Sequence, residues 1–301
     1  MVKETLNLSP TETVDTAYAA FDRQPIDVQL QALLEGQARA ILAVQSRIPE
    51  LAKAVEAASD RLRGSSGRLI YAGAGCSIRL GVQDGVELVP TFGWPMARLE
   101  YLIAGGPDAL SASVEGAEDD CRSATEAVAA LNLDSDDVVI GIAASGNTPY
   151  TCQVIRSAAA CGALTIGVSS NPAGQLLALA DHGLLTETGP EVLAGSTRLA
   201  AGTAQKALLN ALSTALMTAL GRVLGNEMLC VQATNAKLKD RQVRILVHQV
   251  PSISMVSARE LLQSVHWDLR LALLMAKGLP QSDAEAAVAS EEPFRAIWSR
   301  H

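Results

Sequence analysis

Aromatic residues are scarce in this chain, where three Phe, three Trp and four Tyr make up 3% of 301 residues. The core must therefore consist mostly of Ala, Leu, Val and Ile. Hydrophobic residues amount to 49%, which is enough to bury a full core. The length suits one large domain with a small appendage, or two domains.

Cysteine and histidine are also few. The five cysteines are odd in number and form no Cys-x-x-Cys pair, and the four histidines are scattered along the chain. This pattern predicts reduced thiols rather than a disulfide framework, and it gives no sign of a metal cluster. We expect neither a metal nor a cofactor.

An excess of basic residues is missing, because the net charge is −8. A chain of this kind lacks the basic face that nucleic acid requires. The negative net charge is compatible with a phosphate ligand, since a few N–H groups and one Arg or Lys are sufficient to bind one. The first ten residues lack the apolar stretch of a signal peptide, and no uncharged run reaches the roughly 18 residues of a membrane span. We expect a cytoplasmic protein without membrane contact.

Apolar strand-like runs alternate with helix-like runs from residue 69 onwards. Strands are expected at 69–72, 98–103, 138–143, 164–168 and 183–186. Helices are expected at 79–88, 117–131, 150–161 and 174–180. This alternation predicts an α/β fold with a parallel sheet covered on both faces. Five strands fit a flavodoxin-like, doubly wound αβα sandwich, whose ligand site lies at the topological switch point.

The chain divides into three expected parts. Residues 1–63 form an N-terminal arm and helices, and residues 64–250 form the sheet domain. A long helix rich in Ala and Leu, at 202–225, is apolar on more than one face and should be buried against the sheet or a partner subunit. Residues 251–301 form a small unit of three helices.

The most informative stretch is residues 68–81, Arg-Leu-Ile-Tyr-Ala-Gly-Ala-Gly-Cys-Ser-Ile-Arg-Leu-Gly. A strand here ends in two glycines, which allow close backbone approach, and a helix-compatible segment follows. Ser77 can cap that helix or bind a ligand oxygen. Such a loop offers backbone N–H groups to an anion. It is not a dinucleotide motif, because Ile78 takes the place of the last glycine.

Further loops repeat this chemistry at later strand ends. Their candidate ligand-binding side chains are hydroxyls, one amide and two cations: Ser145, Asn147, Thr148, Ser169, Ser196, Thr197, Arg198 and Lys206. Because the carboxyl ends of parallel strands share one edge, these loops together predict a phosphorylated small molecule there. N-capped turns and structural ion pairs remain the alternative reading.

Carboxylates are the candidates for catalysis, since neither a Ser/His/Asp set nor a metal cluster is evident. Glu87 stands in the apolar context Gly-Val-Glu-Leu-Val-Pro, and Glu115 and Glu118 stand in Val-Glu-Gly-Ala-Glu-Asp. A carboxyl group in apolar surroundings keeps its proton more readily and can act as a general acid. Solvated carboxylates on helix faces are the alternative.

Many motifs in fixed order carry a family resemblance over roughly residues 35–300. They are Gly73-Ala-Gly with Ser77 and Arg79-Leu-Gly-Val, Pro90-Thr-Phe-Gly, Leu102-Ile-Ala-Gly-Gly-Pro, Val114-Glu-Gly-Ala-Glu-Asp, Ala143-Ala-Ser-Gly, Thr148-Pro-Tyr, Gly189-Pro-Glu, Gly195-Ser-Thr-Arg-Leu, Gly202-Thr-Ala-Gln-Lys and Ala233-Thr-Asn-Ala-Lys-Leu. Together they resemble the N-acetylmuramic acid 6-phosphate etherases. These are proteins of the sugar isomerase (SIS) fold, related to the glucokinase regulatory protein.

The resemblance implies a lyase of cell-wall recycling that cleaves the D-lactyl ether of N-acetylmuramate 6-phosphate by elimination and hydration. It implies Glu87 as the acid and Glu118 as the base, with no metal. Two other functions on this fold remain open: a non-catalytic sugar-phosphate sensor or kinase regulator, and an aldose–ketose isomerase. The presence of both carboxylates favours ether elimination.

The sequence departs from the family pattern in the expected sugar-phosphate loops. Cys76 and Ile78 stand in place of Thr and Gly, Val86 in place of Ser, and Asn147 in place of Arg. These changes bear on the identity of the sugar phosphate.

The distance along the first helix predicts an oligomer. An unbroken helix from Ser77 to Glu87 would separate the two residues by about 15 Å. Either Gly81 or Gly85 interrupts the helix, or Glu87 serves a site shared between subunits. We expect the second, a symmetric homodimer with its sites near the interface.

Overall fold

The computed structural model describes residues 9–290 and 292–301, so the first eight residues of the expected arm lie outside the description. The chain divides into two compact units. The first comprises the residues up to Gly85 together with Ala97–Ser213, and the second comprises Val86–Met96 and Thr214–His301. The expected boundaries near residues 63 and 250 stay a prediction.

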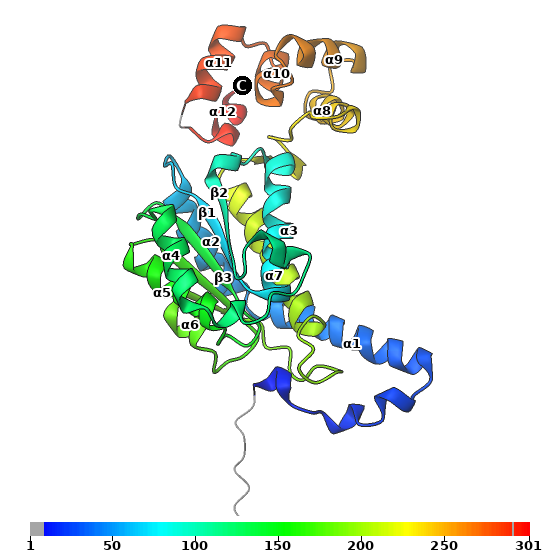
Figure 1. Cartoon of the computed structure of the whole chain (residues 1–301). Helices are drawn as coiled ribbons and strands as arrows, with labels where there is room; N and C mark the ends of the chain where they lie inside the picture. The colour runs from blue at the N-terminus through cyan, green and yellow to red at the C-terminus, as the bar shows by residue number, and fades with distance from the viewer. Residues whose placement is uncertain (1–8, 291) are drawn as a thin grey trace, which may run out of the picture. The chain divides into compact units, whose positions relative to one another are not determined.

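A parallel sheet of five strands forms the centre of the first unit (Figure 1). Its strands are β1 (Leu69–Gly73), β2 (Leu99–Ile103), β3 (Val138–Ile142), β4 (Leu164–Ser169) and β5 (His182–Leu185). The order is β2-β1-β3-β4-β5, and every neighbouring pair is parallel. The expected α/β sheet of five strands is confirmed, and the order reverses between β1 and β3.

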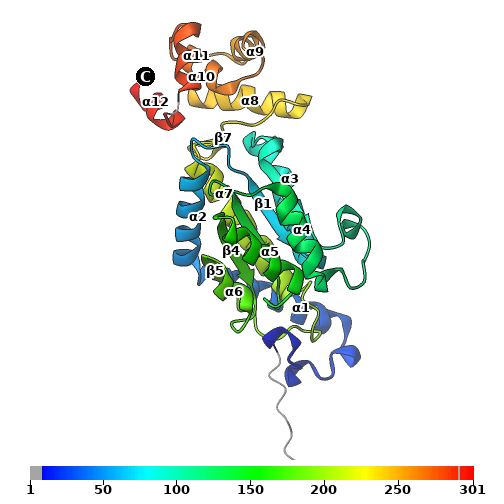
Figure 2. The ribbon, with the colours of Figure 1, turned by 60° about the vertical axis from the view of Figure 1, so that its left-hand side comes forward.

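Helices cover both faces of this sheet, as Figure 2 shows. On one face lie α4 (Cys121–Leu131), α5 (Pro149–Ala160) and α6 (Gln175–Leu179), while α2 (Ile48–Leu62) packs against β3, β4 and β5. All five residues of β1 are buried, and alternate residues face opposite layers. Ile70 belongs to the core under α4 and α5, whereas Tyr71 faces α3 (Gly75–Phe92).

Two long helices, α3 and α7 (Ala200–Ala219), run side by side and parallel. A Cβ on Gly202 of α7 would lie 3.9 Å from Cys76 Sγ of α3. Eight residues further along both helices, Asn210 donates a hydrogen bond to Asp84. Because α3 follows β1 directly, the N-termini of both helices lie at the carboxyl edge of the sheet.

The helix α3 is unbroken from Gly75 to Phe92, so the glycine interruption considered from the sequence is wrong. Gly81 serves packing instead, because a Cβ there would lie 2.8 Å from Ile142 Cδ1. Gly85 plays the same part against Tyr101, whose hydroxyl would be 2.5 Å from such a Cβ. Both glycines let the helix approach the sheet closely.

From residue 9 to Gln45, the described part of the N-terminal segment contains three short 3-10 helices and a long α-helix. They are η1 (Pro10–Glu12), η2 (Thr16–Tyr18), η3 (Phe21–Arg23) and α1 (Ile26–Gln45). The arm joins the first unit through Gly195, whose N–H donates to the carbonyl of Thr11 at 2.8 Å. On α1 only Gly36, Ala40 and Val44 are buried.

The second unit is mainly helical. It contains α8 (Ala236–Gln249), α9 (Met255–Ser264), α10 (Leu269–Ala276), α11 (Gln281–Ala289), α12 (Phe294–Arg300) and a hairpin of β6 (Val223–Leu224) and β7 (Glu227–Met228). The hairpin, α8 and α12 were not predicted, and the hairpin and α12 are too short for a clear period. The helix expected at 202–225 ends earlier, because α7 stops at Ala219 and β6 follows it. With α12, residues 251–301 contain four described helices instead of the expected three. Phe294 and Ile297 anchor α12 in the core of this unit. Within the described residues, no helix has the length and apolarity to cross a membrane.

Candidate functional site

The loops after β1 and β2 enclose a small pocket at the carboxyl edge of the sheet. The pocket measures about 180 Å³ and is lined by Ala74 and Gly75, by Arg79, and by the loop that contains Glu115 and Glu118. In parallel register, Gly73 is level with Ile103 on one side and with Ile142 on the other. Three strand ends therefore meet here, and the base expected from the resemblance lies beside the glycine-rich loop.

Arg79 fixes the loop that carries Glu118. Its guanidinium group donates to the carbonyl of Ala109 at 2.8 Å and to that of Ala112 at 3.0 Å. No carboxylate takes part in these contacts, so the positive charge is left facing a pocket that also holds two glutamates. The arrangement ties the N-terminal part of α3 to the loop after β2.

Glu118 lies in a 3-10 turn, η6 (Ala117–Asp119), and not in the helix expected over residues 117–131. The helix α4 begins at Cys121, because the Asp120 side chain accepts a hydrogen bond from Ser123 N and caps it. Gly116, with φ of 71°, turns the chain just before η6. The exposed Glu118 is thus held in a loop at the pocket.

The second hydroxyl loop follows β3 and packs on the loop after β4. Asn171 Nδ2 donates to the carbonyl of Ser145 at 3.0 Å. Gly146 has φ of 67°, and a Cβ there would lie 2.5 Å from Ser169 Oγ. Ser169 is fully buried and its hydroxyl hydrogen-bonds within these two loops, while Thr148 is half-buried ahead of Pro149 at the start of α5.

The third group of candidates surrounds the start of α7. Ser196, Thr197 and Arg198 lie in the preceding loop, which the N–H of Gly202 closes by donating to the carbonyl of Thr197. The first-turn N–H groups of Ala200 and Ala201 donate to the carboxylate of Glu191, each at 2.9 Å. No local signal in the sequence indicated this cap, because Glu191 lies nine residues before the helix.

Lys206 belongs to a chain of hydrogen bonds that extends into the interior. Its Nζ donates to Asn210 Oδ1 at 2.5 Å, and Asn210 Nδ2 donates to Asp84 Oδ1 at 2.5 Å. Asp84 is buried and also accepts from Ser213 at 3.1 Å and from Tyr71 at 2.8 Å. Burial, followed by the charge of Asp84, raises the pKa of Tyr71 well above its usual value. Sequence reasoning missed Asp84, whose partners lie on another helix and a strand.

Two family models match the part of the chain that forms the sheet. The model of the glucokinase regulatory protein N-terminal SIS domain matches residues 50–159, and the SIS domain model matches residues 121–215. An N-acetylmuramic acid 6-phosphate etherase of Deinococcus radiodurans is 47% identical over 275 residues, which are 91% of this chain and 90% of that protein. The chain belongs to the N-acetylmuramic acid 6-phosphate etherase family.

Other relatives in this etherase family also match more than three quarters of the chain. The one from Streptomyces avermitilis is 46% identical over 78% of this chain and 76% of its own length. The one from Salmonella choleraesuis is 41% identical over 98% of this chain and 96% of its own length. Among solved structures, a phosphoheptose isomerase of Francisella tularensis gives a TM-score of 0.48 at 16% identity, covering 65% of this chain and 100% of that chain.

The residues that differ from the etherase pattern lie in different structural environments. Ile78 is fully buried, and a Cβ on Gly73 would lie 3.3 Å from the Ile78 Cβ, so the larger side chain fills the core behind the loop. Asn147 is exposed and its Oδ1 accepts from the N–H of Gln175 at 3.1 Å, at the start of α6. Val86 is 47% exposed in the second unit. The change at residue 78 is therefore a matter of packing.

Glu87, the acid expected from the etherase resemblance, lies exposed on α3 within the second unit. Ser77, at 9% exposure, lies in the first turn of the same helix. With α3 unbroken, the ten-residue step from Ser77 to Glu87 spans about 15 Å along the helix axis. In the part of the chain that the structure describes, no three His, Cys, Asp or Glu side chains are grouped as a metal site would require.

Proposed function

We propose that the protein cleaves the D-lactyl ether at C3 of N-acetylmuramate 6-phosphate. One water is consumed, and the products are N-acetylglucosamine 6-phosphate and D-lactate. The reaction is an elimination followed by a hydration, which makes the protein a carbon–oxygen lyase. Cell-wall recycling in the cytoplasm is the corresponding role, and five unpaired cysteines are in keeping with a reducing compartment.

The observation that carries this proposal is the position of Glu118 in the pocket beside Gly75. In the open-chain sugar, the C1 aldehyde makes the C2 proton acidic. Glu118 takes that proton as the lactyl C3–O bond breaks, and Glu87 gives a proton to the departing oxygen. Water then adds at C3 of the unsaturated aldehyde. Relatives bearing the etherase name at 41–47% identity support the assignment.

The phosphate is assigned to the loops around the N-termini of α3 and α5. Ser77 and the backbone N–H groups of the first loop, with Ser145 and Thr148 of the second, supply the donors. Ser169 stabilises these loops, because its buried hydroxyl accepts a hydrogen bond from the N–H of Asn171. Asn147, Ser196, Thr197, Arg198 and Lys206 complete the proposed set of ligand-binding residues. No cofactor enters this scheme.

The decisive experiment is incubation of the full chain with N-acetylmuramate 6-phosphate, followed by an enzymatic assay of D-lactate. Equimolar release of D-lactate and N-acetylglucosamine 6-phosphate is the expected result. If the protein binds the substrate in calorimetry and releases no D-lactate, the etherase proposal is rejected.

A regulator that binds a sugar phosphate without converting it is the second candidate. The match of residues 50–159 to the glucokinase regulatory protein SIS model favours it. The two candidates differ in the same assay, because a regulator would return the sugar phosphate unchanged. An isomerase would instead interconvert aldose and ketose phosphates, which NMR of the incubated mixture would detect.

A homodimer is part of the proposal. Ile26, Leu30, Leu34 and Ile41 repeat along α1 at helical spacing and are 73%, 54%, 67% and 42% exposed. A second copy would cover this apolar stripe. It would also allow Glu87 of one subunit to complete a site on the other, since the length of α3 separates Glu87 from Ser77 of the same chain.

A further inference from the structure

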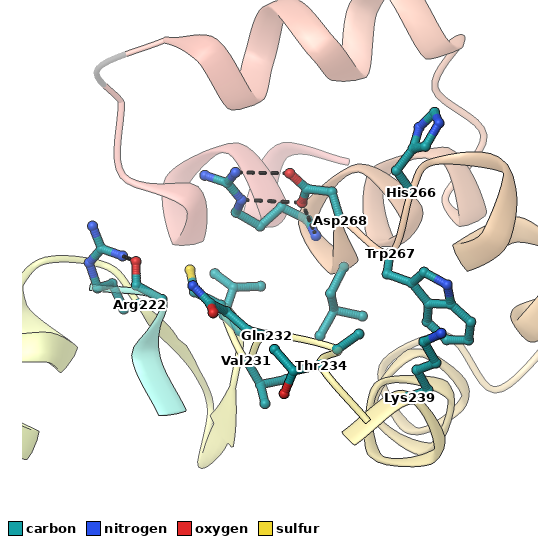
Figure 3. A pocket seen from close by; sticks show the side chains of 14 residues that line it. Arg222, Val231, Gln232, Thr234, Lys239, His266, Trp267 and Asp268 are labelled. Carbon is teal, nitrogen blue, oxygen red and sulfur yellow. Dashed lines mark hydrogen bonds and ion pairs between the residues drawn. The ribbon is translucent and has the colours of Figure 1, made fainter. Parts of the chain in front are cut away.

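The second unit contains a pocket of its own, of about 670 Å³, between the segment after β7 and the junction of α9 and α10 (Figure 3). Figure 3 shows Arg222 on one side of this pocket and Trp267 with Lys239 on the other. Every lining residue belongs to the second unit. None of them has a part in the proposed etherase chemistry.

A buried glutamine holds the two walls of the pocket together. Gln242, at 1% exposure, donates from Nε2 to the carbonyl of Val231 at 2.7 Å and to that of Trp267 at 3.1 Å. His266 and Trp267 both have positive φ, 52° and 63°, where side chains of their size are strained. Lys239 lies 5.1 Å from the centre of the Trp267 ring. The pocket therefore has a fixed frame.

The charges that line this pocket do not balance. Arg222, Lys239 and Arg270 carry three positive charges and Asp268 carries one negative charge, which leaves +2 with His266 neutral. The whole chain, in contrast, has a net charge of −8. A concentration of positive charge in an acidic protein indicates an anionic ligand.

The single carboxylate is already engaged. Asp268 binds Arg270 through both oxygens, with Nη2 at 2.9 Å and Nε at 3.3 Å, and it also caps α10 by accepting from the N–H of Arg270. Burial opposes the charge of Arg270, but the hydrogen bonds to Asp268 outweigh it and raise the Arg270 pKa. Of its guanidinium group, Nη1 is left for a ligand.

Arg222 has no acidic partner among the described residues. Its Nη1 donates to the carbonyls of Phe92 and Gly93 at 2.9 and 2.8 Å, and its guanidinium group lies 5.1 Å from the Trp94 ring centre. These contacts fix the group without neutralising it. Burial and the nearby charge of Arg270 lower the Arg222 pKa, so the two cations repel each other. An anion bound between the two guanidinium groups would reduce this electrostatic repulsion.

We propose that this pocket is a second anion site that binds a phosphate dianion, either inorganic phosphate or the phosphate group of a monoester. A dianion cancels the charge of +2, whereas a monocarboxylate cancels half of it. Arg222 offers Nε and Nη2, Arg270 offers Nη1, and the exposed side chains of Gln232 and Thr234 lie at the rim.

Fluorine NMR of the full chain labelled with 5-fluorotryptophan tests the proposal without reference to activity. The three tryptophans give three signals, which Trp→Phe variants assign. Titration with inorganic phosphate at constant ionic strength should shift the Trp267 signal saturably, with the Trp298 signal unmoved. Acetate should produce no saturable shift over the same range. If phosphate leaves Trp267 unaffected, or if acetate acts equally well, the proposal is wrong.

Variants of pocket residues, each with a matched control outside the pocket, test whether phosphate binds in this pocket. Gln232→Glu adds a negative charge at the rim and removes no contact of the fold, and Arg270→Gln removes one cation. Each should weaken phosphate binding at Trp267 on the order of tenfold or more. The matched controls Gln263→Glu and Arg259→Gln, in α9 of the same unit and outside the pocket, should leave it unchanged. Ser145→Ala, in the first unit, should also leave it unchanged. Equal loss in variants and controls would overturn the assignment.

Discussion

The hydroxyl of Tyr71 donates a 2.8 Å hydrogen bond to the carboxylate of Asp84, and both side chains are buried between β1 and α3. Tyr71→Phe removes one of three donors to a buried carboxylate. We expect the free energy of unfolding to fall by about 1–3 kcal/mol. Urea denaturation followed by circular dichroism measures this.

Tyr101 provides the matched control, since its ring stacks on Tyr71 with centroids 6.0 Å apart. Its buried hydroxyl has no hydrogen-bond partner among the residues described, and burial, followed by the charge of Asp84, raises its pKa to about 12. Tyr101→Phe should therefore leave stability unchanged or increase it. A loss as large as that of Tyr71→Phe would show that the hydroxyl–carboxylate bond is not the cause.

Acid should destabilise the first unit through Asp137. Burial opposes its charge, but hydrogen bonds from Arg68, including one of 2.6 Å from Nη2, outweigh burial and lower its pKa. A carboxyl group with a lowered pKa stabilises the fold above its unfolded pKa of about 3.9, and this contribution is lost as the pH falls through the folded value. Asp137→Asn should cost about 3–5 kcal/mol at neutral pH and flatten the acid limb of the stability profile. Glu126→Gln, which breaks an exposed ion pair with Arg122, should cost less than about 1 kcal/mol.

Removal of the proposed base should abolish catalysis without abolishing binding. Glu118→Gln should lower kcat for D-lactate release by about 10²–10⁴-fold, because the amide cannot accept the C2 proton. Calorimetry should still detect binding of the sugar phosphate. Asp119→Asn changes the neighbouring exposed carboxylate and should retain activity. If both variants lose the same factor, the effect is one of local charge and Glu118 is not the base.

Disruption of the apolar stripe on α1 should dissociate the proposed dimer. Leu34→Glu places a charge on a side chain that is 67% exposed, so it should not unfold the chain. Sedimentation velocity should shift from dimer to monomer, and D-lactate release should fall with it because Glu87 would lose its partner site. Gln31→Glu, on another face of the same helix, should keep the dimer. A parent protein that is monomeric and fully active would contradict the shared site.

The sheet was predictable because each strand is a short apolar run bounded by glycine or polar turns. All five expected strands agree with the observed strands to within one residue at either end. The start of α3 was missed by four residues, since Gly75 and Ser77 are weak helix formers that tertiary packing overrides. The start of α4 was misplaced because Asp120 is a cap that composition alone does not distinguish from a helix-face carboxylate.

Contacts between distant residues could not be predicted in the same way. Asp84 meets Tyr71, Asn210 and Ser213, which lie on a strand before it and a helix far after it. Arg222 and Arg270 line one pocket although 48 residues separate them in sequence. Periodicity reports which face of an element is apolar, whereas these contacts depend on how the elements pack.

The carboxylate of Glu191 at the start of α7 affects where an anion can bind at the carboxyl edge of the sheet. Two helices, α3 and α7, bring their positive ends to the same edge of the sheet, and a buried side chain of the chain itself already neutralises one of them. At this edge an incoming anion is left with the N-terminal ends of α3 and α5, which follow the neighbouring parallel strands β1 and β3. A second anionic group placed beside the start of α7 would be repelled by the carboxylate of Glu191.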